Sequence, residues 1–225
     1  MDDVKIRIGQ AAAALVTDGM VVGLGTGSTA ACFIDALAKR YENEGLNIVT
    51  VASSHASEKH ARDLGLPFVQ IDAIEQIDIT FDGADEITST RQMIKGAGGA
   101  LLKEKILAAA SRELVILIDE TKRVDTLGKR KLPVEVVQFG HRICQKELLK
   151  YAKEAILRMR GDGKPYITDS GNFIYDLELA NLIDNVEELD AKIRHIVGVV
   201  ETGLFYNYPG RIVVGFTDGT VKIYE

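Results

Sequence analysis

A glycine-rich turn near the start of the chain separates an apolar run from an amphipathic helical pattern. Residues 20–22 read Met-Val-Val, residues 23–30 read Gly-Leu-Gly-Thr-Gly-Ser-Thr-Ala, and apolar residues then recur at helical spacing as far as Tyr41. Glycine allows a backbone to approach a ligand closely, and the free N–H groups at the start of a helix attract anions. This order of residues predicts a strand, a turn and a helix start, an arrangement suited to binding a phosphate group.

The turn alone does not identify its ligand. The dinucleotide-binding fingerprint has a third glycine where this chain has Ser28, and the lysine of a P-loop is missing. A tight connection between a strand and a helix, with no ligand at all, would have a similar sequence. The choice between these interpretations depends on the rest of the chain.

Strand and helix patterns alternate over roughly the first 120 residues. Helical patterns include residues 4–17 and a helix that begins near Ala100, and apolar runs predict strands at 20–24, 47–52, 67–71, 77–81 and 114–118. Such alternation is typical of a parallel sheet with crossover helices. We therefore predict an α/β fold with a Rossmann-like, mostly parallel sheet and helices on both faces.

The pattern changes near Gly128. We expect a strand at 134–139, a helix at 141–158, two strands around the hairpin signal Asp-Ser-Gly-Asn at 169–172, a helix at 186–196 and a strand at 198–205. This β-α-β-β-α-β order matches the ferredoxin-like arrangement. We predict a catalytic domain of residues 1–128 and 206–225. A small α+β domain, residues 129–205, is inserted before the C-terminal strands at 212–216 and 221–224.

Composition limits the classes of partner. The net charge of -6 argues against a nucleic-acid-binding protein, which usually carries a basic patch. No apolar run approaches the ~20 residues of a membrane span, and the acidic start of the chain lacks the apolar core of a signal peptide. The two cysteines, Cys32 and Cys144, have no metal-binding spacing and form no disulfide framework. We expect a cytoplasmic protein that binds a small molecule and neither nucleic acid nor a membrane.

Polar residues gather where predicted strands end. The clusters lie at residues 25–29, at 53–57, at 82–86 together with the loop 95–99, and at 119–122. Ligands of parallel sheets bind outside the carboxyl ends of the strands. We therefore expect these clusters to converge on one crevice.

Three carboxylates follow the fourth predicted strand within five residues: Asp82, Asp85 and Glu86. They could serve as solvated turn residues, as helix caps or as ligands of Mg²⁺ or Ca²⁺. Lys95 follows soon after, and a nearby cation lessens the need for a metal. Glu104 lies in the first turns of the next helix, where an exposed carboxylate beside Lys103 and Lys105 would be the ordinary interpretation.

Several blocks of this sequence, taken in order, are similar to the defining blocks of type A ribose-5-phosphate isomerases. They are residues 23–30, 82–86, 95–105, 119–122, 127–129, 132–136 and 203–205. The resemblance extends over nearly the whole chain. In the loop at 95–99, a methyl group at Ala97 is compatible with the turn only if that residue avoids a positive φ.

The resemblance implies an enzyme of the non-oxidative pentose phosphate pathway that interconverts D-ribose 5-phosphate and D-ribulose 5-phosphate. It implies that Glu104 moves a proton between C2 and C1 through a cis-enediol(ate), and that the protein forms a homodimer or a dimer of dimers. The implied catalytic residues are Glu104, Asp82, Asp85 and Lys95. The implied substrate-binding residues are Thr26, Gly27, Ser28, Thr29, Asp82, Gly83, Ala84, Asp85, Lys95, Gly96, Ala97, Gly98 and Lys122. Lys5 corresponds to a further basic contact near the phosphate.

These roles agree with the chemistry of proton abstraction next to a carbonyl, which needs a positioned carboxylate and fixed donors for the enediolate oxygens. The scheme requires no metal and no cofactor, so we predict neither. Two other hypotheses remain: a sugar-phosphate sensor that binds without turnover, and a nucleotide-binding domain. A sensor has no need of a base such as Glu104, and a nucleotide-binding domain would need the missing third glycine.

Overall fold

The computed structural model describes residues 2–225, so that Met1 lies outside the described residues. The chain divides into two compact units. The first unit comprises Met1–Ala84, Lys103–Lys122 and Tyr208–Glu225, and the second comprises Asp85–Leu102 and Arg123–Asn207. The chain therefore leaves the first unit and returns to it twice.

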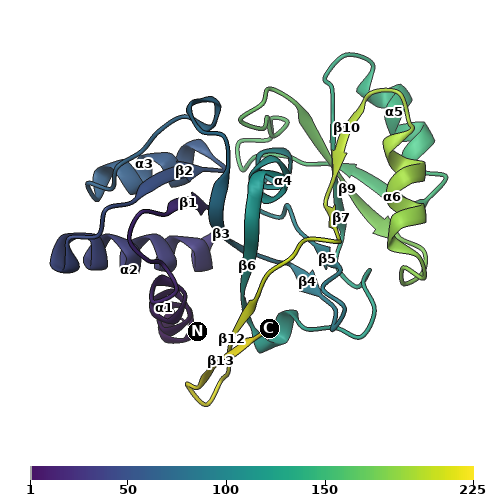
Figure 1. Ribbon diagram of the computed structural model, residues 1–225. Coiled ribbons are helices and arrows are strands. Elements are labelled where there is room, and N and C mark those ends of the chain that lie inside the picture. The colour runs from purple at the N-terminus through teal and green to yellow at the C-terminus, as the bar shows by residue number, and fades with distance from the viewer. Residues whose placement is uncertain (1) are drawn as a thin grey trace. The chain divides into compact units, whose positions relative to one another are not determined.

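A six-stranded sheet forms the centre of the first unit, in the order β13-β12-β6-β3-β1-β2 (Figure 1). Five strands are mutually parallel, and β13 alone pairs antiparallel, with β12. The prediction of a mostly parallel α/β sheet is confirmed. The strands are β1 (Val21–Leu24), β2 (Val49–Ala52), β3 (Ile77–Gly83), β6 (Ser111–Asp119), β12 (Ile212–Gly215) and β13 (Val221–Tyr224).

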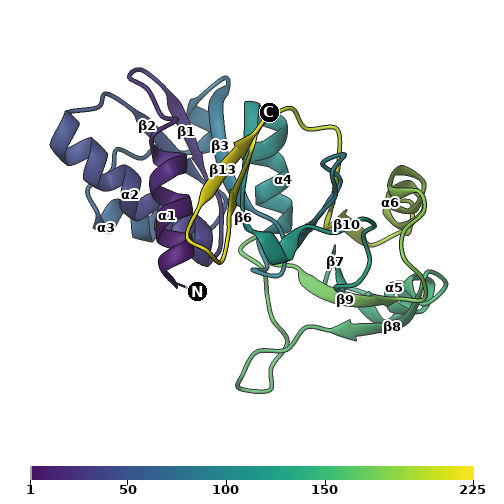
Figure 2. The ribbon, with the colours of Figure 1, turned by 90° about the horizontal axis from the view of Figure 1, so that it is seen from below.

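Helices cover both faces of this sheet. Figure 2 shows α1 (Asp2–Ala13) and α2 (Ser28–Glu44) on one side of the strands and α4 (Leu101–Ala110) on the other. On the first side, Phe33 of α2 stacks on Phe81 of β3 with 4.2 Å between ring centroids. On the second, Leu107 of α4 packs in a separate cluster with Val51 and Ile77. The short helix α3 (His55–Asp63) adds Ala61 to the first cluster.

The second unit contains an α+β arrangement with antiparallel strands. Its main elements follow the order β-α-β-β-α-β, and its four-stranded sheet has the order β10-β7-β9-β8. A smaller three-stranded sheet has the order β11-β5-β4. The elements are β4 (Glu86–Ile87), β5 (Met93–Ile94), β7 (Leu132–Val136), α5 (His141–Leu148), β8 (Ala152–Leu157), β9 (Phe173–Leu179), α6 (Val186–Arg194), β10 (Val199–Thr202) and β11 (Leu204–Phe205).

The helix predicted at 141–158 is wrong in its second half. The helix α5 ends at Leu148, and residues 152–157 form the strand β8, which pairs antiparallel with β9. Residues 152–157 read Ala-Lys-Glu-Ala-Ile-Leu, which individually favour a helix. Pairing with a neighbouring strand overrides that local preference, because strand formation depends on cross-strand contacts.

The strand predicted at 67–71 is also wrong. Only Phe68 forms a bridge there, to Thr50 of β2, and residues 71–73 form the short 3₁₀ helix η1 (Ile71–Ala73). Pro67 lacks the N–H group that a sheet ladder needs. The segment therefore touches the edge of the sheet without extending it.

The compact units differ from the predicted division of the chain. Residues 85–102 and 123–128 belong to the second unit, whereas the prediction placed them with the sheet of residues 1–128. β4 and β5 pair with each other and with β11, and the carboxylate of Glu86 accepts hydrogen bonds from the N–H groups of Gly128 and Arg130. The contacts of β5 with β11 and of Glu86 with Gly128 and Arg130 join residues more than forty positions apart, which explains why the sequence does not reveal them.

Candidate active site

The turn after β1 lies where the connections of the sheet change direction. β1 has β2 on one side and β3 on the other, so that the chain leaves β1 in one direction and later crosses to its other side. Ligands of open α/β sheets bind beyond the carboxyl ends of strands at such a switch point. Gly25 follows β1 here, and its N–H donates to the carbonyl of Phe81 at 2.8 Å.

Asp82 lies against this turn. Its side chain is buried, and its Oδ1 accepts a hydrogen bond from the N–H of Thr26 at 3.1 Å. A Cβ atom at Gly25 would lie only 2.2 Å from the same oxygen. The second glycine of the turn is therefore needed for close approach of the backbone to Asp82, which brings two of the predicted site segments together.

Serines after β2 brace the turn from another side. The hydroxyl of Thr26 lies 2.8 Å from Ser53 Oγ and 2.9 Å from Ser54 Oγ, and Ser57 donates to the carbonyl of Gly25 at 2.6 Å. Ser54 also caps α3 by accepting the N–H of Ser57. The sequence predicts a polar cluster here. It does not predict these bracing contacts, because they join residues that follow two different strands.

The start of α2 has the features of an anion site. Gly27 occupies the N-cap position with a φ of 116°, and no described side chain caps the free N–H groups of this 17-residue helix. Ser28 is exposed, and its hydroxyl accepts a hydrogen bond from the ammonium group of Lys5 at 2.8 Å. A lysine, a hydroxyl and free N–H groups thus gather at one helix end, next to the partly buried Thr29.

The carboxylates after β3 have different surroundings. Asp82 faces the turn, Gly83 and Ala84 are partly exposed, and Asp85 Oδ2 accepts the N–H of Ala97 at 2.9 Å. Glu86 is buried and holds the backbone at Gly128 and Arg130, so its role is structural. In the described chain, no three His, Cys, Asp or Glu side chains lie close enough to hold a metal ion.

Residues 95–99, which we call the glycine loop, form a tight bend in the second unit. Gly96 and Gly99 have φ angles of 101° and 82°, and the N–H of Gly99 donates to the carbonyl of Gly96 at 3.0 Å. Ala97 is absent from the residues with positive φ, so its methyl group causes no strain. The bend thus places its positive-φ residues where only glycine fits.

Lys95 begins the glycine loop and is buried, with 2 % of its surface exposed. Its N–H donates to the carbonyl of Gly203 at 2.9 Å, and its ammonium group lies 5.3 Å from the ring centroid of Phe205. Lysine is rarely buried to this degree unless its charge has a function or a partner. Gly203 and Phe205 belong to the block that the resemblance singles out near the end of the chain.

Glu104 is buried as well, with 3 % of its surface exposed, although Lys103 and Lys105 on either side are partly exposed. It lies in the first turn of α4, where the helix dipole favours negative charge. The ordinary interpretation, an exposed helical carboxylate, is therefore wrong for this residue. A buried acidic side chain next to a helix start has the character of a functional group.

One further predicted residue, Lys122, lies in a short connection. Lys122 ends the 3₁₀ helix η2 (Glu120–Lys122) after β6 and is partly buried. Glu120 fixes this segment by accepting hydrogen bonds from the N–H and hydroxyl of Thr217. His55 is exposed at the start of α3.

Within each unit, part of the predicted site is brought together. The first unit joins Asp82 to the turn at residues 25–26, and the second joins Asp85 to the glycine loop through Ala97. The convergence of all the polar clusters on one crevice stays a prediction.

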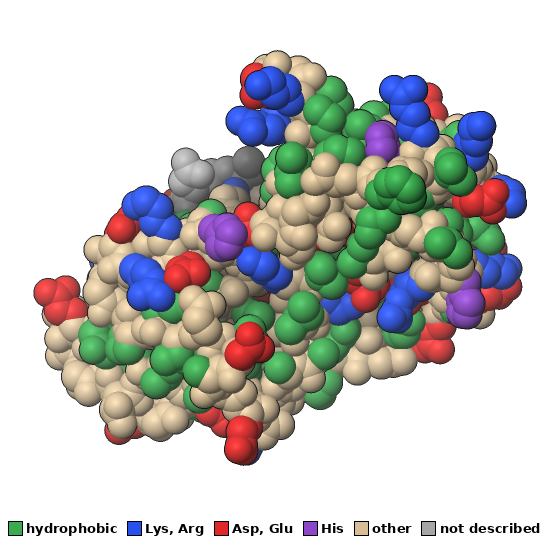
Figure 3. Space-filling model, turned by 90° about the horizontal axis from the view of Figure 1, so that it is seen from above, with side chains coloured by type: hydrophobic (Ala, Val, Ile, Leu, Met, Phe, Trp, Pro, Cys, Tyr) green, Lys and Arg blue, Asp and Glu red, His purple; other side chains and the backbone are tan. Residues whose placement is uncertain are grey.

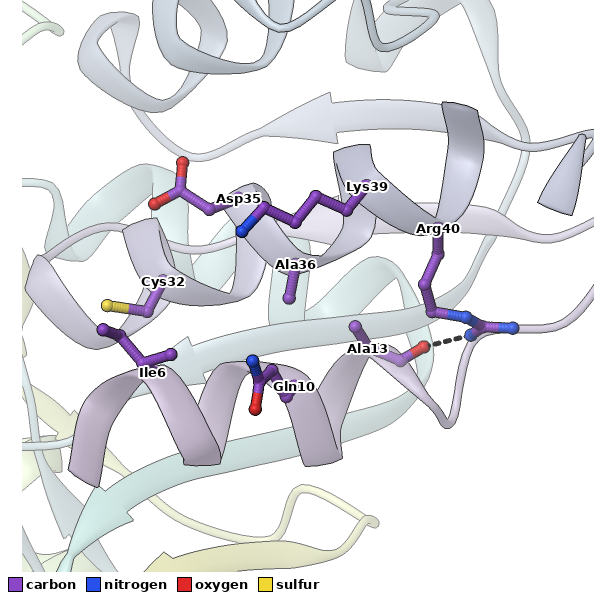
Figure 4. Close-up of a pocket in the computed structure, with 8 residues that line it drawn as sticks. All are labelled: Ile6, Gln10, Ala13, Cys32, Asp35, Ala36, Lys39 and Arg40. Atoms are coloured by element: carbon purple, nitrogen blue, oxygen red, sulfur yellow. Dashed lines mark hydrogen bonds between the residues drawn. The ribbon is translucent and has the colours of Figure 1, made fainter. Parts of the chain in front are cut away.

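A groove of about 340 Å³ between α1 and α2 contains none of the predicted site residues (Figure 4). The guanidinium of Arg40 donates there to the carbonyls of Ala13 and Val16 at the end of α1, and Glu44 raises the pKa of Arg40 further. We infer that this groove results from the packing of α1 against α2 and is not the active site.

On the face drawn in Figure 3, basic and acidic side chains are interspersed. In the described residues, no helix combines the length and the apolar character that a membrane span requires.

Comparisons with known proteins agree with one another. The family model for ribose 5-phosphate isomerase A (phosphoriboisomerase A) matches residues 49–219. A curated ribose-5-phosphate isomerase A from Protochlamydia amoebophila is 46% identical over 92% of this chain and 89% of its own. The solved structure of ribose 5-phosphate isomerase A from Methanocaldococcus jannaschii has a TM-score of 0.92 at 39% identity, covering 99% of this chain and 98% of that chain. A D-ribose-5-phosphate isomerase solved in complex with phospho-erythronic acid has a TM-score of 0.94 at 34% identity, covering 100% and 99%.

Proposed function

The chain belongs to the ribose 5-phosphate isomerase A family. From that premise we propose that it interconverts D-ribose 5-phosphate and D-ribulose 5-phosphate, with Glu104 moving a proton between C2 and C1. As a member of this family the protein is an isomerase.

Glu104 is the proposed base. In the open-chain aldose its carboxylate removes the proton from C2, and the electron pair moves to form the C1–C2 double bond while the C1 oxygen takes up a proton. The resulting cis-enediol(ate) then receives the proton from Glu104 at C1, and the hydroxyl at C2 loses its proton to become the ketone. No atom is gained or lost, and Glu104 ends in its starting form.

Lys95 and the glycine loop stabilise the negative charge that develops on the oxygens of C1 and C2. A buried ammonium group and fixed N–H groups need no reorganisation during the reaction, so they lower the barrier more than solvent does. Asp82 and Asp85 carry protons among the sugar hydroxyls or orient Lys95. The scheme uses neither a metal ion nor a cofactor.

The phosphate provides binding energy remote from the reacting carbons. We assign it to residues 26–29 at the start of α2, with Lys5 and Lys122 as basic contacts. The hydrogen bond between Lys5 and Ser28 and the uncapped N–H groups support this assignment. Gly83, Ala84 and the backbone at 96–98 complete the proposed contacts with the sugar. The phospho-erythronic acid bound in the related structure also carries a phosphate group.

The single observation that carries the proposal is the burial of Glu104. Burying a carboxylate costs free energy, so a glutamate with 3 % of its surface exposed indicates a functional role. In a family of isomerases that role is proton transfer. We further expect the enzyme to act in the cytoplasm as a homodimer or a dimer of dimers.

The direct test is to follow the purified protein with D-ribose 5-phosphate in D₂O by NMR. We expect conversion to D-ribulose 5-phosphate with deuterium entering at C1, because a carboxylate base exchanges its proton with solvent. Binding of phospho-erythronic acid without any conversion would instead support the sensor. Conversion that retained the C2 hydrogen completely would point to hydride transfer.

A further inference from the structure

Arg158 lies at the centre of an unassigned set of contacts around the glycine loop. It follows β8 and is mostly buried, with 15% of its side chain exposed. One of its nitrogens, Nη1, donates to the carbonyls of Gly96 at 3.0 Å and Ala97 at 3.1 Å. The other side of its guanidinium binds the carboxylate of Asp176 in β9 through Nε and Nη2.

These two hydrogen bonds fix the direction of two peptide groups. In a trans peptide the C=O and N–H groups point in opposite directions. Because Arg158 holds both carbonyl oxygens, the N–H groups of Ala97 and Gly98 point away from it. The N–H of Ala97 donates to Asp85, whereas that of Gly98 has no acceptor among residues 2–225 and lies in an exposed residue.

We propose that Arg158 is a positioning residue that directs the N–H of Gly98 toward the substrate, where this N–H stabilises an oxygen of the enediolate. This inference rests on the proposed function. A cation on a carbonyl oxygen also polarises the peptide group, which makes the N–H on its far side a stronger donor. Arg158 thus acts on the reaction through the loop, without touching the substrate.

Other side chains of the second unit also contact the glycine loop, the residues that follow it, or Arg158 itself. Tyr166 packs so closely against Gly99 that a Cβ there would lie 2.3 Å from the tyrosine hydroxyl oxygen. The guanidinium carbon of Arg158 lies 6.0 Å from the centre of the Tyr166 ring. After the loop, the N–H of Leu102 donates to the buried carboxylate of Glu135. Asp176, with 20% of its side chain exposed, keeps Arg158 in place.

The test compares Arg158→Met and Arg158→Lys with the control Arg160→Met. Lysine keeps the charge near Asp176 but lacks the planar fork that reaches a carboxylate and two carbonyls together. Arg160 is a nearby exposed arginine whose guanidinium pairs with Asp162 at 3.4 Å. Four quantities are measured on the full chain: kcat and KM for D-ribose 5-phosphate, the melting temperature, and amide hydrogen exchange in peptides that cover residues 95–99, β7 and β9.

We expect both Arg158 variants to speed up exchange in the glycine loop at least tenfold while exchange in β7 and β9 stays as in the wild type. We expect kcat to fall at least tenfold with a smaller change in KM, and Arg160→Met to match the wild type throughout. If Arg158→Met does not fold, Arg158→Lys still gives the comparison.

Unchanged loop exchange and unchanged kcat in Arg158→Lys would overturn the proposal. A uniform rise of exchange across the second unit with a lower melting temperature would also overturn it, because that result describes a merely structural arginine. The exchange measurement uses no substrate. A wild-type protein without isomerase activity would therefore refute the proposed function, whereas the loop exchange reports on the positioning role separately.

Discussion

At Gly25 the backbone lies so close to Asp82 that a side chain has no room. A Cβ at this position would lie 2.2 Å from Oδ1 and 2.6 Å from Cα of Asp82. We predict that Gly25→Ala lowers the free energy of unfolding by about 1–3 kcal/mol, as overpacking does, and reduces activity by moving Asp82. Urea unfolding and the isomerase assay measure the two effects.

The control is Gly161→Ala, since Gly161 has an ordinary φ and open space around its Cβ position. Equal stability of the two alanine variants would contradict the close packing at Gly25.

Glu135 should give stability a measurable pH dependence. Burial raises the pKa of its carboxyl above the ordinary value, although hydrogen bonds from Asn172, Thr168 and the Leu102 backbone oppose this. A raised pKa in the folded state means that the protonated form stabilises the fold. That contribution is complete below the unfolded pKa, which is about 4.3, and is lost as the pH rises through the folded value.

We therefore predict that Glu135→Gln, which cannot ionise, gains stability relative to the wild type as the pH rises from 4 to 7. Thermal unfolding of both proteins across this range measures the difference. A difference in melting temperature that does not vary with pH would show that the carboxyl has an ordinary pKa.

Among the elements, α2 has the clearest assigned task. Its free N–H groups, Ser28 and Thr29 are proposed to hold the phosphate in the ground state and the transition state alike. Ser28→Ala or Thr29→Ala should then raise KM about tenfold and leave kcat nearly unchanged. A tenfold rise is roughly the effect of losing one hydrogen bond to a charged group. Steady-state kinetics with the exposed Ser89→Ala as control checks this, and a fall in kcat alone would place the phosphate elsewhere.

Local sequence patterns predict some of the elements but not others. The strand-turn-helix unit around Gly25 could be predicted, because its glycines and apolar periodicity are all within thirty residues. β8 could not, because its helix-favouring residues become a strand only through pairing with β9. Arg158 was missed for the same reason, since it follows that strand and no motif contains it.

For the whole molecule, the parallel sheet and the family follow from the sequence, but the division into units does not. Residues 85–102 belong to the second unit because β4, β5 and Glu86 find partners far along the chain. The site residues themselves were found largely through the resemblance. From spacing alone, Glu104 between two lysines would pass for a surface residue, and only its burial distinguishes it.

Catalysis by the whole protein should not depend on a metal ion. In the proposed scheme Lys95 and backbone N–H groups provide the positive charge that a metal would otherwise supply. We predict that kcat/KM stays within a factor of about two after exhaustive treatment with a chelator. Loss of most activity, restored by adding Mg²⁺ or Ca²⁺, would revive the carboxylate-metal interpretation of Asp82 and Asp85.

The most direct test of the central claim is Glu104→Gln, assayed beside Glu42→Gln, which alters an exposed glutamate of α2. Glutamine preserves the shape of the side chain but cannot accept the proton from C2. The predicted result is that Glu104→Gln loses kcat by at least about a thousandfold and still binds phospho-erythronic acid by calorimetry, whereas Glu42→Gln behaves as the wild type. Turnover by Glu104→Gln at the wild-type rate would contradict the account.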